Sequence, residues 1–282
     1  MVWGDQVMLA AGTLIVLIVL LYAPVFGLMA RQWWEDPNWS HGFLVPAFSG
    51  FVLWRERRRW LGTGNGGSWL GLVGIAWAVV LLVVGTLAAE LFTTRFSFVV
   101  LLASLVLYLA GWRRLGAVAF PLGYLVFMIP WPGVLYAEVT LPLQILASRW
   151  AAAALAAVHI PVLREGNLLI LANYTLEVAQ ACSGIRSLVS LVTVAVAYAY
   201  LAEKQMRMRA MLVALMVPIA VASNAFRIFG TGALTAEISP RLAQGFFHEF
   251  SGWLIFLTAA VLMLGAHVLL KWLSGRIEAL RG

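Results

Sequence analysis

Charged residues are scarce in this sequence of 282 residues, since only 11% are Asp, Glu, Lys or Arg, whereas 63% are hydrophobic. Soluble domains contain about 25% charged residues, and a soluble core of this length could not bury so much apolar surface. Several apolar runs exceed the roughly 18 residues that indicate a membrane-spanning helix. These features exclude a soluble globular fold and predict an integral membrane protein.

Cysteine is almost absent, because Cys182 is the single one in the chain. One cysteine excludes an intramolecular disulfide and a CxxC metal or redox pair. The glycines between Gly62 and Gly67 form no phosphate-binding pattern and indicate a turn region. We therefore expect neither a metal nor a cofactor in this protein.

Acidic residues are fewer than basic ones, which gives a formal net charge of +7. Such an excess can indicate a nucleic-acid-binding protein. In this chain, however, the basic residues follow apolar runs, as they do where a helix leaves a lipid bilayer. The charge pattern thus predicts membrane lipid as a partner and argues against nucleic acid.

The order of apolar runs predicts an all-α polytopic membrane protein with about eight transmembrane helices and a single domain over residues 1–282. The first run is too long for the apolar part of a signal peptide, and we expect it to be retained. Residues 134–158 are apolar but contain Glu138, Gln144 and Arg149, and indicate an interfacial or re-entrant helix. Residues 160–180 alternate in part and predict a small extended excursion outside the bilayer. The expected spans are residues 7–30, 41–54, 69–89, 96–111, 115–129, 183–201, 210–229 and 249–270.

The positive-inside rule predicts the orientation of these spans. An amino terminus in the cytoplasm places 12 of the 19 basic residues on the inner side, provided that residues 134–158 cross the membrane an even number of times. The simplest case is no crossing, which leaves residues 160–181 and 230–247 outside. The twelve inner residues are Arg55, Arg57, Arg58, Arg59, Arg113, Arg114, Lys204, Arg207, Arg209, Lys271, Arg276 and Arg281.

Three chemically informative residues then lie on one outer face, although they were not used to assign the topology: Cys182, Arg227 and His248. A helix amino terminus and a nearby cation such as Arg227 or Arg186 both lower the pKa of a thiol and favour the nucleophilic thiolate. His248 could carry a proton between the thiol and a leaving amine. Arg227 could stabilise the oxyanion of a tetrahedral intermediate.

Each of these residues also has a plain structural interpretation. A lone cysteine in a membrane helix often packs as a small apolar residue, and Arg227 could extend its charge to the interface. His248 and Glu249 could form a solvated pair, whereas His159 and His267 indicate packing or interfacial positions. Further candidates for an orienting or substrate-contacting role, each with a structural alternative, are Glu177, Asn224 and His41.

Four segments resemble the exosortase/archaeosortase family of membrane transpeptidases. Residues 181–188 resemble its nucleophile motif, residues 224–228 its arginine motif, and residues 248–253 its histidine motif. Residues 36–46, followed by Trp54 and Arg55, resemble the amino-terminal signature of bacterial exosortases. The segments occur in the family's order and extend over most of the chain, and a histidine in the third motif favours the bacterial branch.

The resemblance implies a cysteine protease-transpeptidase with Cys182 as nucleophile and Arg227 and His248 as its partners. Its substrates would be secreted proteins with a tripartite carboxy-terminal sorting signal: a short motif such as Pro-Glu-Pro, one membrane helix and a basic end. An acyl-enzyme on Cys182 would form at the outer, periplasmic face of the bacterial cytoplasmic membrane. An unidentified amine or water would then resolve it. The alternative is a non-enzymatic transporter or assembly factor for envelope exopolysaccharide.

Overall fold

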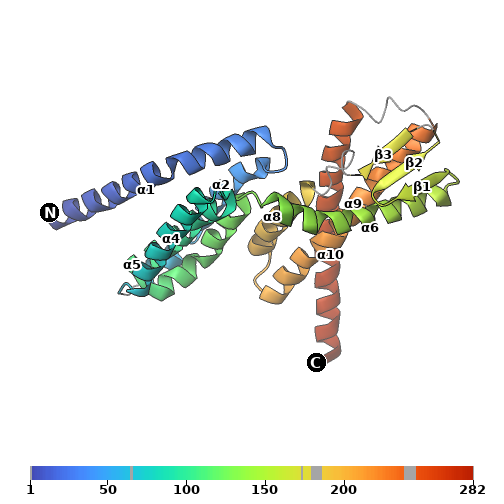
Figure 1. The fold of residues 1–282 in the computed structure, drawn as a ribbon. Helices are drawn as coiled ribbons and strands as arrows, with labels where there is room; N and C mark the ends of the chain where they lie inside the picture. The colour runs from blue at the N-terminus through green and yellow to red at the C-terminus, as the bar shows by residue number, and fades with distance from the viewer. Residues whose placement is uncertain (1, 64–65, 173, 179–185, 238–245, 282) are drawn as a thin grey trace. The chain divides into compact units, whose positions relative to one another are not determined.

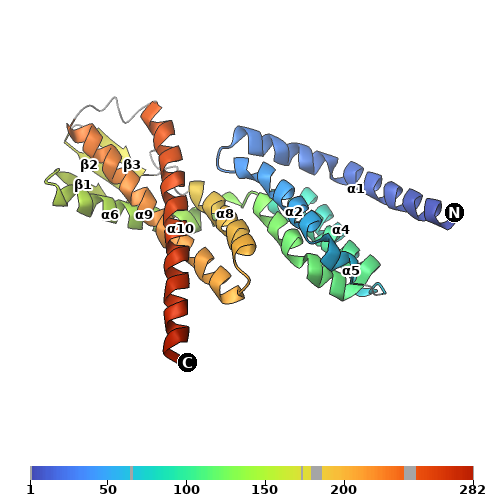
Figure 2. The same cartoon turned by 180° about the vertical axis from the view of Figure 1, so that it is seen from behind.

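The structure, a computed structural model, describes residues 2–63, 66–172, 174–178, 186–237 and 246–281. It is helical over most of this length, which confirms the all-α polytopic class. Contacts group the chain into two compact units, Met1–Pro132 and Gly133–Gly282, called here the first and second units (Figures 1 and 2). Each unit is described by itself below.

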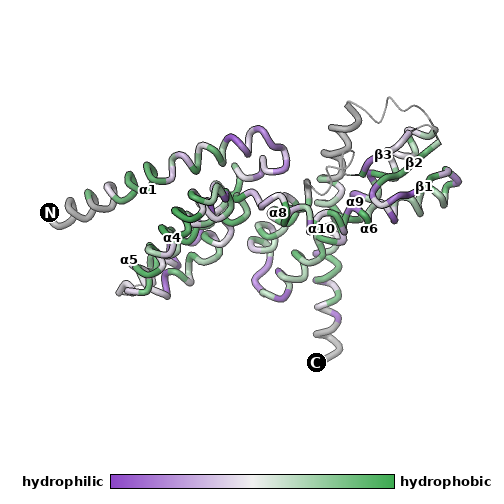
Figure 3. Tube along the Cα trace, viewed as in Figure 1, coloured by the Kyte–Doolittle hydropathy of each residue, from purple (hydrophilic) through white to green (hydrophobic). Residues whose placement is uncertain are grey.

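Six helical stretches in the described part of the chain are long and apolar enough to cross a membrane. They are Gly12–Glu35, Leu70–Leu87, Leu91–Met128, Gly133–Ala157, Met206–Ala236 and Phe256–Ser274, and the apolar stretch Leu188–Ala202 is shorter. The chain is therefore a multi-pass membrane protein. Hydrophilic residues gather at the turn after the first helix, at the turns of a small sheet and at the turn after Leu188–Ala202 (Figure 3).

The regular elements of the first unit, over its described residues, are all helices. Its elements are α1 (Val2–Glu35), η1 (Ser40–Phe43), α2 (Leu44–Arg55), α3 (Arg57–Leu61), α4 (Leu70–Leu87), α5 (Leu91–Tyr124) and η2 (Leu125–Met128). Tyr22 of α1, Ala78 and Leu82 of α4, and Leu101 of α5 form one buried cluster of this unit.

The long helix α5 contains two spans that the sequence predicted separately. Gly111 has φ 78° and ψ 179°, which breaks the helix at the expected boundary. On either side of it, Arg95 donates to Gln32 at 2.8 Å and Met128 accepts from Trp33 at 2.9 Å, both at the end of α1. The amide of Ser68 and the carbonyl of Leu107 meet at the opposite end. The chain therefore reverses at Gly111, as the two predicted spans require.

Helices α4 and α5 pack closely because α4 presents small residues at regular spacing. Gly71, Ala78 and Gly85 follow a spacing of seven residues, which keeps them on one face. A Cβ atom on Gly71 would lie 2.3 Å from the backbone nitrogen of Tyr108, and one on Gly85 would lie 2.5 Å from Thr94 Oγ1. Small residues of this kind allow membrane helices to approach closely.

The second unit combines helices with a small antiparallel sheet. Its elements are α6 (Gly133–Ala157), β1 (Val162–Glu165), β2 (Leu168–Leu171), β3 (Tyr174–Glu177), α8 (Arg186–Ala202), α9 (Met206–Glu237) and α10 (Phe246–Arg281). The strands pair in the order β1-β2-β3, with Leu163 opposite Ile170 and Leu169 opposite Leu176. The extended excursion predicted for residues 160–180 is therefore a three-stranded sheet.

Two buried clusters fix α9 within this unit. On one side Val221, Ala225 and Ile228 pack with α6, with Leu176 of β3 and with Val178, which follows β3. On the other side Met216 and Ala220 pack with residues of α8 and α10, namely Leu188, Leu191, Ala195, Ala259 and Met263. Helix α6 lies alongside α9, and in both ribbon views it runs across α10 (Figures 1 and 2).

The sequence expectation for residues 230–247 was partly wrong. It ended the seventh span at Phe229 and placed a polar loop over residues 230–247, but α9 continues to Glu237. Tertiary contact overrides the weak helix propensity of glycine at this point, since Gly232 lies where a Cβ would be 3.1 Å from Leu155. Arg227 is therefore ten residues before the end of α9.

Candidate active site

The predicted nucleophile, Cys182, lies outside the described residues, but both neighbouring elements are described. Val178, just after β3, is fully buried against α9 with Val221 and Ile228. Leu188, in the first turn of α8, is buried against Met216 and Ala220 of the same helix. The segment that contains Cys182 therefore begins and ends beside two sides of α9.

Arg227 lies on the same face of α9 as the second of these contacts. At about 100° per helical residue, Arg227 is within about 20° of both Met216 and Ala220 around the helix axis. Asn224 is about 40° from Ala220 and from Ile228, and so lies midway between the two clusters. Arg227 is 5% exposed and Asn224 is fully buried. A charged side chain within an apolar helix indicates a functional position.

The Asn224 amide is unsatisfied within the described structure. Neither its nitrogen nor its oxygen has a hydrogen-bond partner there, and the buried hydroxyl of Ser223 is in the same situation. An unsatisfied buried polar group costs about 1–3 kcal/mol, and most such groups in folded proteins do have partners. Polar groups at residues 223, 224 and 227 thus share one buried stretch of α9. The sequence analysis included Asn224 and Arg227 but missed Ser223, which precedes the arginine motif.

The structure describes the helical backbone at Arg186 and His248. Their places along the helices can therefore be given. Arg186 is the first residue of α8, and His248 lies in the first turn of α10, which begins at Phe246. Helix α8 runs toward the start of α9, and α10 follows the end of α9. The first turns of α8 and α10 therefore lie toward the second half of α9, which contains Arg227. The prediction that α10 begins near His248 agrees with these bounds.

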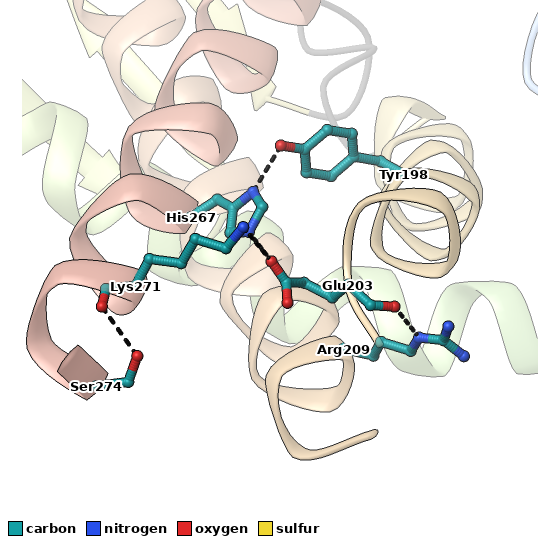
Figure 4. A network of polar contacts seen from close by, with 6 residues as sticks. All are labelled: Tyr198, Glu203, Arg209, His267, Lys271 and Ser274. Carbon is teal, nitrogen blue, oxygen red and sulfur yellow. Dashed lines mark hydrogen bonds and ion pairs between the residues drawn. The ribbon is translucent and has the colours of Figure 1, made fainter. Parts of the chain in front are cut away.

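A polar network joins the end of α8 and the start of α9 to the second half of α10 (Figure 4). His267 contacts the Tyr198 hydroxyl through Nδ1 and the Glu203 carboxylate through Nε2, both at 2.6 Å. Lys271 Nζ lies 2.8 Å from the same Glu203 oxygen, and Arg209 donates to the Glu203 carbonyl. Hydrogen bonds from Lys271 and then His267 lower the pKa of Glu203.

This network also gives a common reference for Arg227 and His248. At about 1.5 Å per residue, Arg227 lies about 27 Å along α9 from Arg209. His248 lies about 28 Å along α10 from His267 by the same rise. Arg209 and His267 both contact Glu203 and so belong to the network. Arg227 and His248 therefore lie at similar distances from the network along α9 and α10. The sequence treated His267 as a packing or interfacial residue and missed the network, although His267 and Lys271 have the i, i+4 spacing of one helix face.

Glu177 does not accompany Asn224 and Arg227. It is the last residue of β3, next to Leu176, which is buried against α9. Because successive strand residues point to opposite faces, the half-buried Glu177 side chain lies on the sheet face away from that cluster. Its place one residue before Val178 still brings its backbone close to α9.

His41 belongs to the first unit and holds a turn there. It is 8% exposed, stacks near Trp39 with ring centroids 5.8 Å apart, and hydrogen-bonds to the main chain of Phe127 and Asn38. Burial lowers the pKa of its imidazole, which favours the neutral ring. Gly42 is required beside it, since a Cβ there would lie 2.3 Å from Trp33 Nε1. The amino-terminal motif thus forms a packed corner of the first unit.

Comparison with known proteins identifies a family. The family model described as transmembrane exosortase (EpsH) matches residues 33–265, which includes the corner at His41, the Cys182 segment, α9 and the start of α10. No curated protein and no solved structure matches the chain. The matched range is well over half of the 282 residues, and the chain belongs to the transmembrane exosortase family.

Proposed function

We propose that this exosortase is a membrane cysteine transpeptidase that cleaves the carboxy-terminal sorting signal of secreted proteins. The observation that carries the proposal is the buried polar stretch of α9, in which Asn224 and Arg227 lie inside the apolar core. Chain connectivity supports Cys182 as their partner. It is four positions after Val178, and an extended chain covers at most about 3.5 Å per residue, so the two are within about 14 Å.

The proposed reaction is acyl transfer through Cys182. The thiolate attacks the carbonyl carbon of the scissile peptide bond, and the Arg227 guanidinium stabilises the oxyanion that forms. The carbon–nitrogen bond then breaks, and His248 gives its proton to the leaving amine. An amine or a water molecule attacks the resulting thioester, loses its proton to His248, and releases the thiolate. The buried surroundings of Arg227 strengthen its electrostatic effect.

The remaining candidates take supporting roles in this scheme. Arg186, at the first position of α8, would lower the pKa of the Cys182 thiol together with the helix amino terminus. Asn224 would orient the reacting groups or donate to the oxyanion. Glu177 would contact the substrate from the far face of the sheet, and His41 would act by holding its corner of the first unit.

The substrate is a protein with one membrane helix, flanked by a short motif such as Pro-Glu-Pro and by a basic cytoplasmic end. Its helix would lie in the lipid beside the enzyme, in the cytoplasmic membrane of a bacterium. The motif would then meet the site at the outer face. This side is supported by the basic residues Lys204, Arg209 and Lys271 at the network end of the second unit, which the positive-inside rule assigns to the cytoplasm.

The test of the mechanism is processing of a co-expressed tripartite substrate. Cys182→Ala should abolish the size shift of the substrate on a blot, whereas Thr13→Ala, a small change at an exposed position of α1 outside the four motifs, should leave it intact. Arg227→Lys should be severely impaired because lysine lacks the planar guanidinium fork. His248→Ala should lose about 10²- to 10⁴-fold in rate through loss of a proton carrier. All rates are normalised to the enzyme level in the same membranes.

Full processing by Cys182→Ala at normal abundance would refute the cysteine mechanism. Cys182→Ser separates the proposal from a non-enzymatic transporter or assembly factor for exopolysaccharide. A transporter should tolerate that near-isosteric change, and the transpeptidase should not.

A further inference from the structure

A cavity of about 150 Å³ opens in the second unit where α6, the sheet and α9 end together. Ile160 and Leu171, both buried, give it apolar walls, and Ala236 at the end of α9 contributes little bulk. Its remaining lining includes the polar residues His159, Tyr174 and Thr235. A cavity of this size holds a small apolar ring or a branched side chain.

His159 occupies an unfavourable backbone position beside this cavity. Its φ is 62°, in the left-handed region where glycine is favoured. The amide of Ile160 bonds to the carbonyl of Leu155, and the amide of His159 to that of Ala156, which defines a Schellman cap with histidine at the usual glycine position. Strain of this kind is retained where the side chain has a use, and the imidazole at this position lines the cavity.

The cavity lies farther along the helix that carries Arg227. Thr235 is eight residues after Arg227, which is about 12 Å along α9. An extended peptide covers this distance in three or four residues at about 3.3 Å each. Consider an extended substrate whose scissile bond lies near Arg227. The residue three or four positions away from that bond then has its side chain at the cavity.

We propose that this cavity is a specificity subsite that takes one compact apolar side chain of the extended substrate segment. The occupied position is the third or fourth residue from the bond that Cys182 attacks. His159 and Tyr174 provide hydrogen-bonding groups for the main chain of the same segment. This assignment rests on the transpeptidase function proposed above, because the substrate segment is the occupant it names.

Replacement of His159 tests the assignment without loss of the fold. His159→Gly removes the backbone strain, so abundance and thermal stability should stay equal or rise. A purely structural role predicts unchanged processing, whereas a subsite predicts a loss of about tenfold in kcat/KM, carried mainly by KM, as for a contact worth about 1.4 kcal/mol. An unchanged kcat/KM in His159→Gly would overturn the proposal.

Filling the cavity gives a second test. Ala236→Trp should raise KM for a substrate with a leucine or proline at the third or fourth position, and should matter less when that residue is glycine. The matched control is Ala153→Trp, at an exposed position of α6 away from the cavity. Equal KM values for the two variants with both substrates would contradict a side-chain subsite.

A binding readout separates this proposal from the reaction itself. A photo-crosslinking residue at position 172, which also lines the cavity, should capture the substrate in the Cys182→Ala background, where no cleavage is expected. Capture together with normal cleavage by Cys182→Ala would refute the cysteine mechanism and keep the binding site. Failure to capture, with Cys182-dependent cleavage intact, would refute the subsite alone.

Discussion

At the scale of single residues, Asn224 combines full burial with an amide that lacks partners in the described structure. We expect Asn224→Leu to keep the free energy of unfolding equal to that of the wild type or to raise it, because the change removes a desolvated amide that costs about 1–3 kcal/mol. Processing of the substrate should nevertheless fall sharply. Thermal unfolding in detergent and the substrate blot measure the two effects.

The control for Asn224 is a buried hydroxyl that is satisfied. Ser148 Oγ donates to the Gly166 carbonyl at 3.0 Å, and so joins α6 to the β1–β2 turn. Ser148→Ala should lower the free energy of unfolding by about 1 kcal/mol and leave the activity per molecule unchanged. If Asn224→Leu lost stability and activity in proportion, the amide would be a structural group and the functional interpretation would fail.

At the scale of elements, Glu203 lies between α8 and α9 and connects them to α10, through contacts with Lys271, His267 and Arg209. Its pKa is lowered in the folded state, so the ion pair stabilises the fold above the ordinary carboxyl pKa of about 4.3. That stabilisation is lost as the pH falls through this value toward the lower folded pKa. Glu203→Gln should therefore lower Tm at pH 7, and the difference from the wild type should shrink below about pH 4.3.

Glu165→Gln is the matched control for this carboxylate, since Glu165 is exposed at the end of β1. It should leave Tm unchanged at both pH values. A Glu203→Gln variant as stable as the wild type at pH 7 would show that the three helices hold together without the ion pair.

The packing of α4 on α5 gives a second prediction for elements. A Cβ on Gly71 would meet the backbone of Tyr108 at 2.3 Å, and backbone atoms cannot move aside as the end of a side chain can. Gly71→Ala should destabilise the first unit by about 1–3 kcal/mol, the usual cost of overpacking. Gly50→Ala, on an exposed face of α2 with nothing within 4 Å, should be neutral or slightly stabilising. Thermal unfolding of both variants checks this, and equal stability would contradict close α4–α5 packing.

At the scale of the whole molecule, the prediction concerns the sides of the membrane. Charge favours a topology in which α6 does not cross, and α6 has the lowest mean hydropathy of the six candidate spans, 1.3. It also contains Glu138, Arg149 and Pro142. Reporters placed after Leu61 and in the β1–β2 turn at Gly166 should therefore report opposite sides. Reports from the same side would mean that α6 crosses, and a reporter at Gln205 would then be external.

The sequence by itself determined the protein's class and the order of its parts. Long apolar runs with few charges can be stable only in lipid, which was confirmed, and the break at Gly111 follows from residues that neighbour one another in the chain. The motif resemblance likewise rests on local residue order, and the family match confirmed the family. The roles of Cys182, Arg227 and His248 stay predictions.

Only the tertiary structure decided which distant residues share a surface. Nothing local to Gly232 shows that Leu155 packs against it, so the sequence ended α9 too early. The alternation of β3 turns Glu177 away from Asn224, and the contact of His267 with Glu203 joins residues 64 positions apart. The cavity at His159 needs three separate segments at once. These features depend on contacts between residues that are far apart in the chain. Local sequence patterns do not reveal such contacts, because they form only in the complete fold.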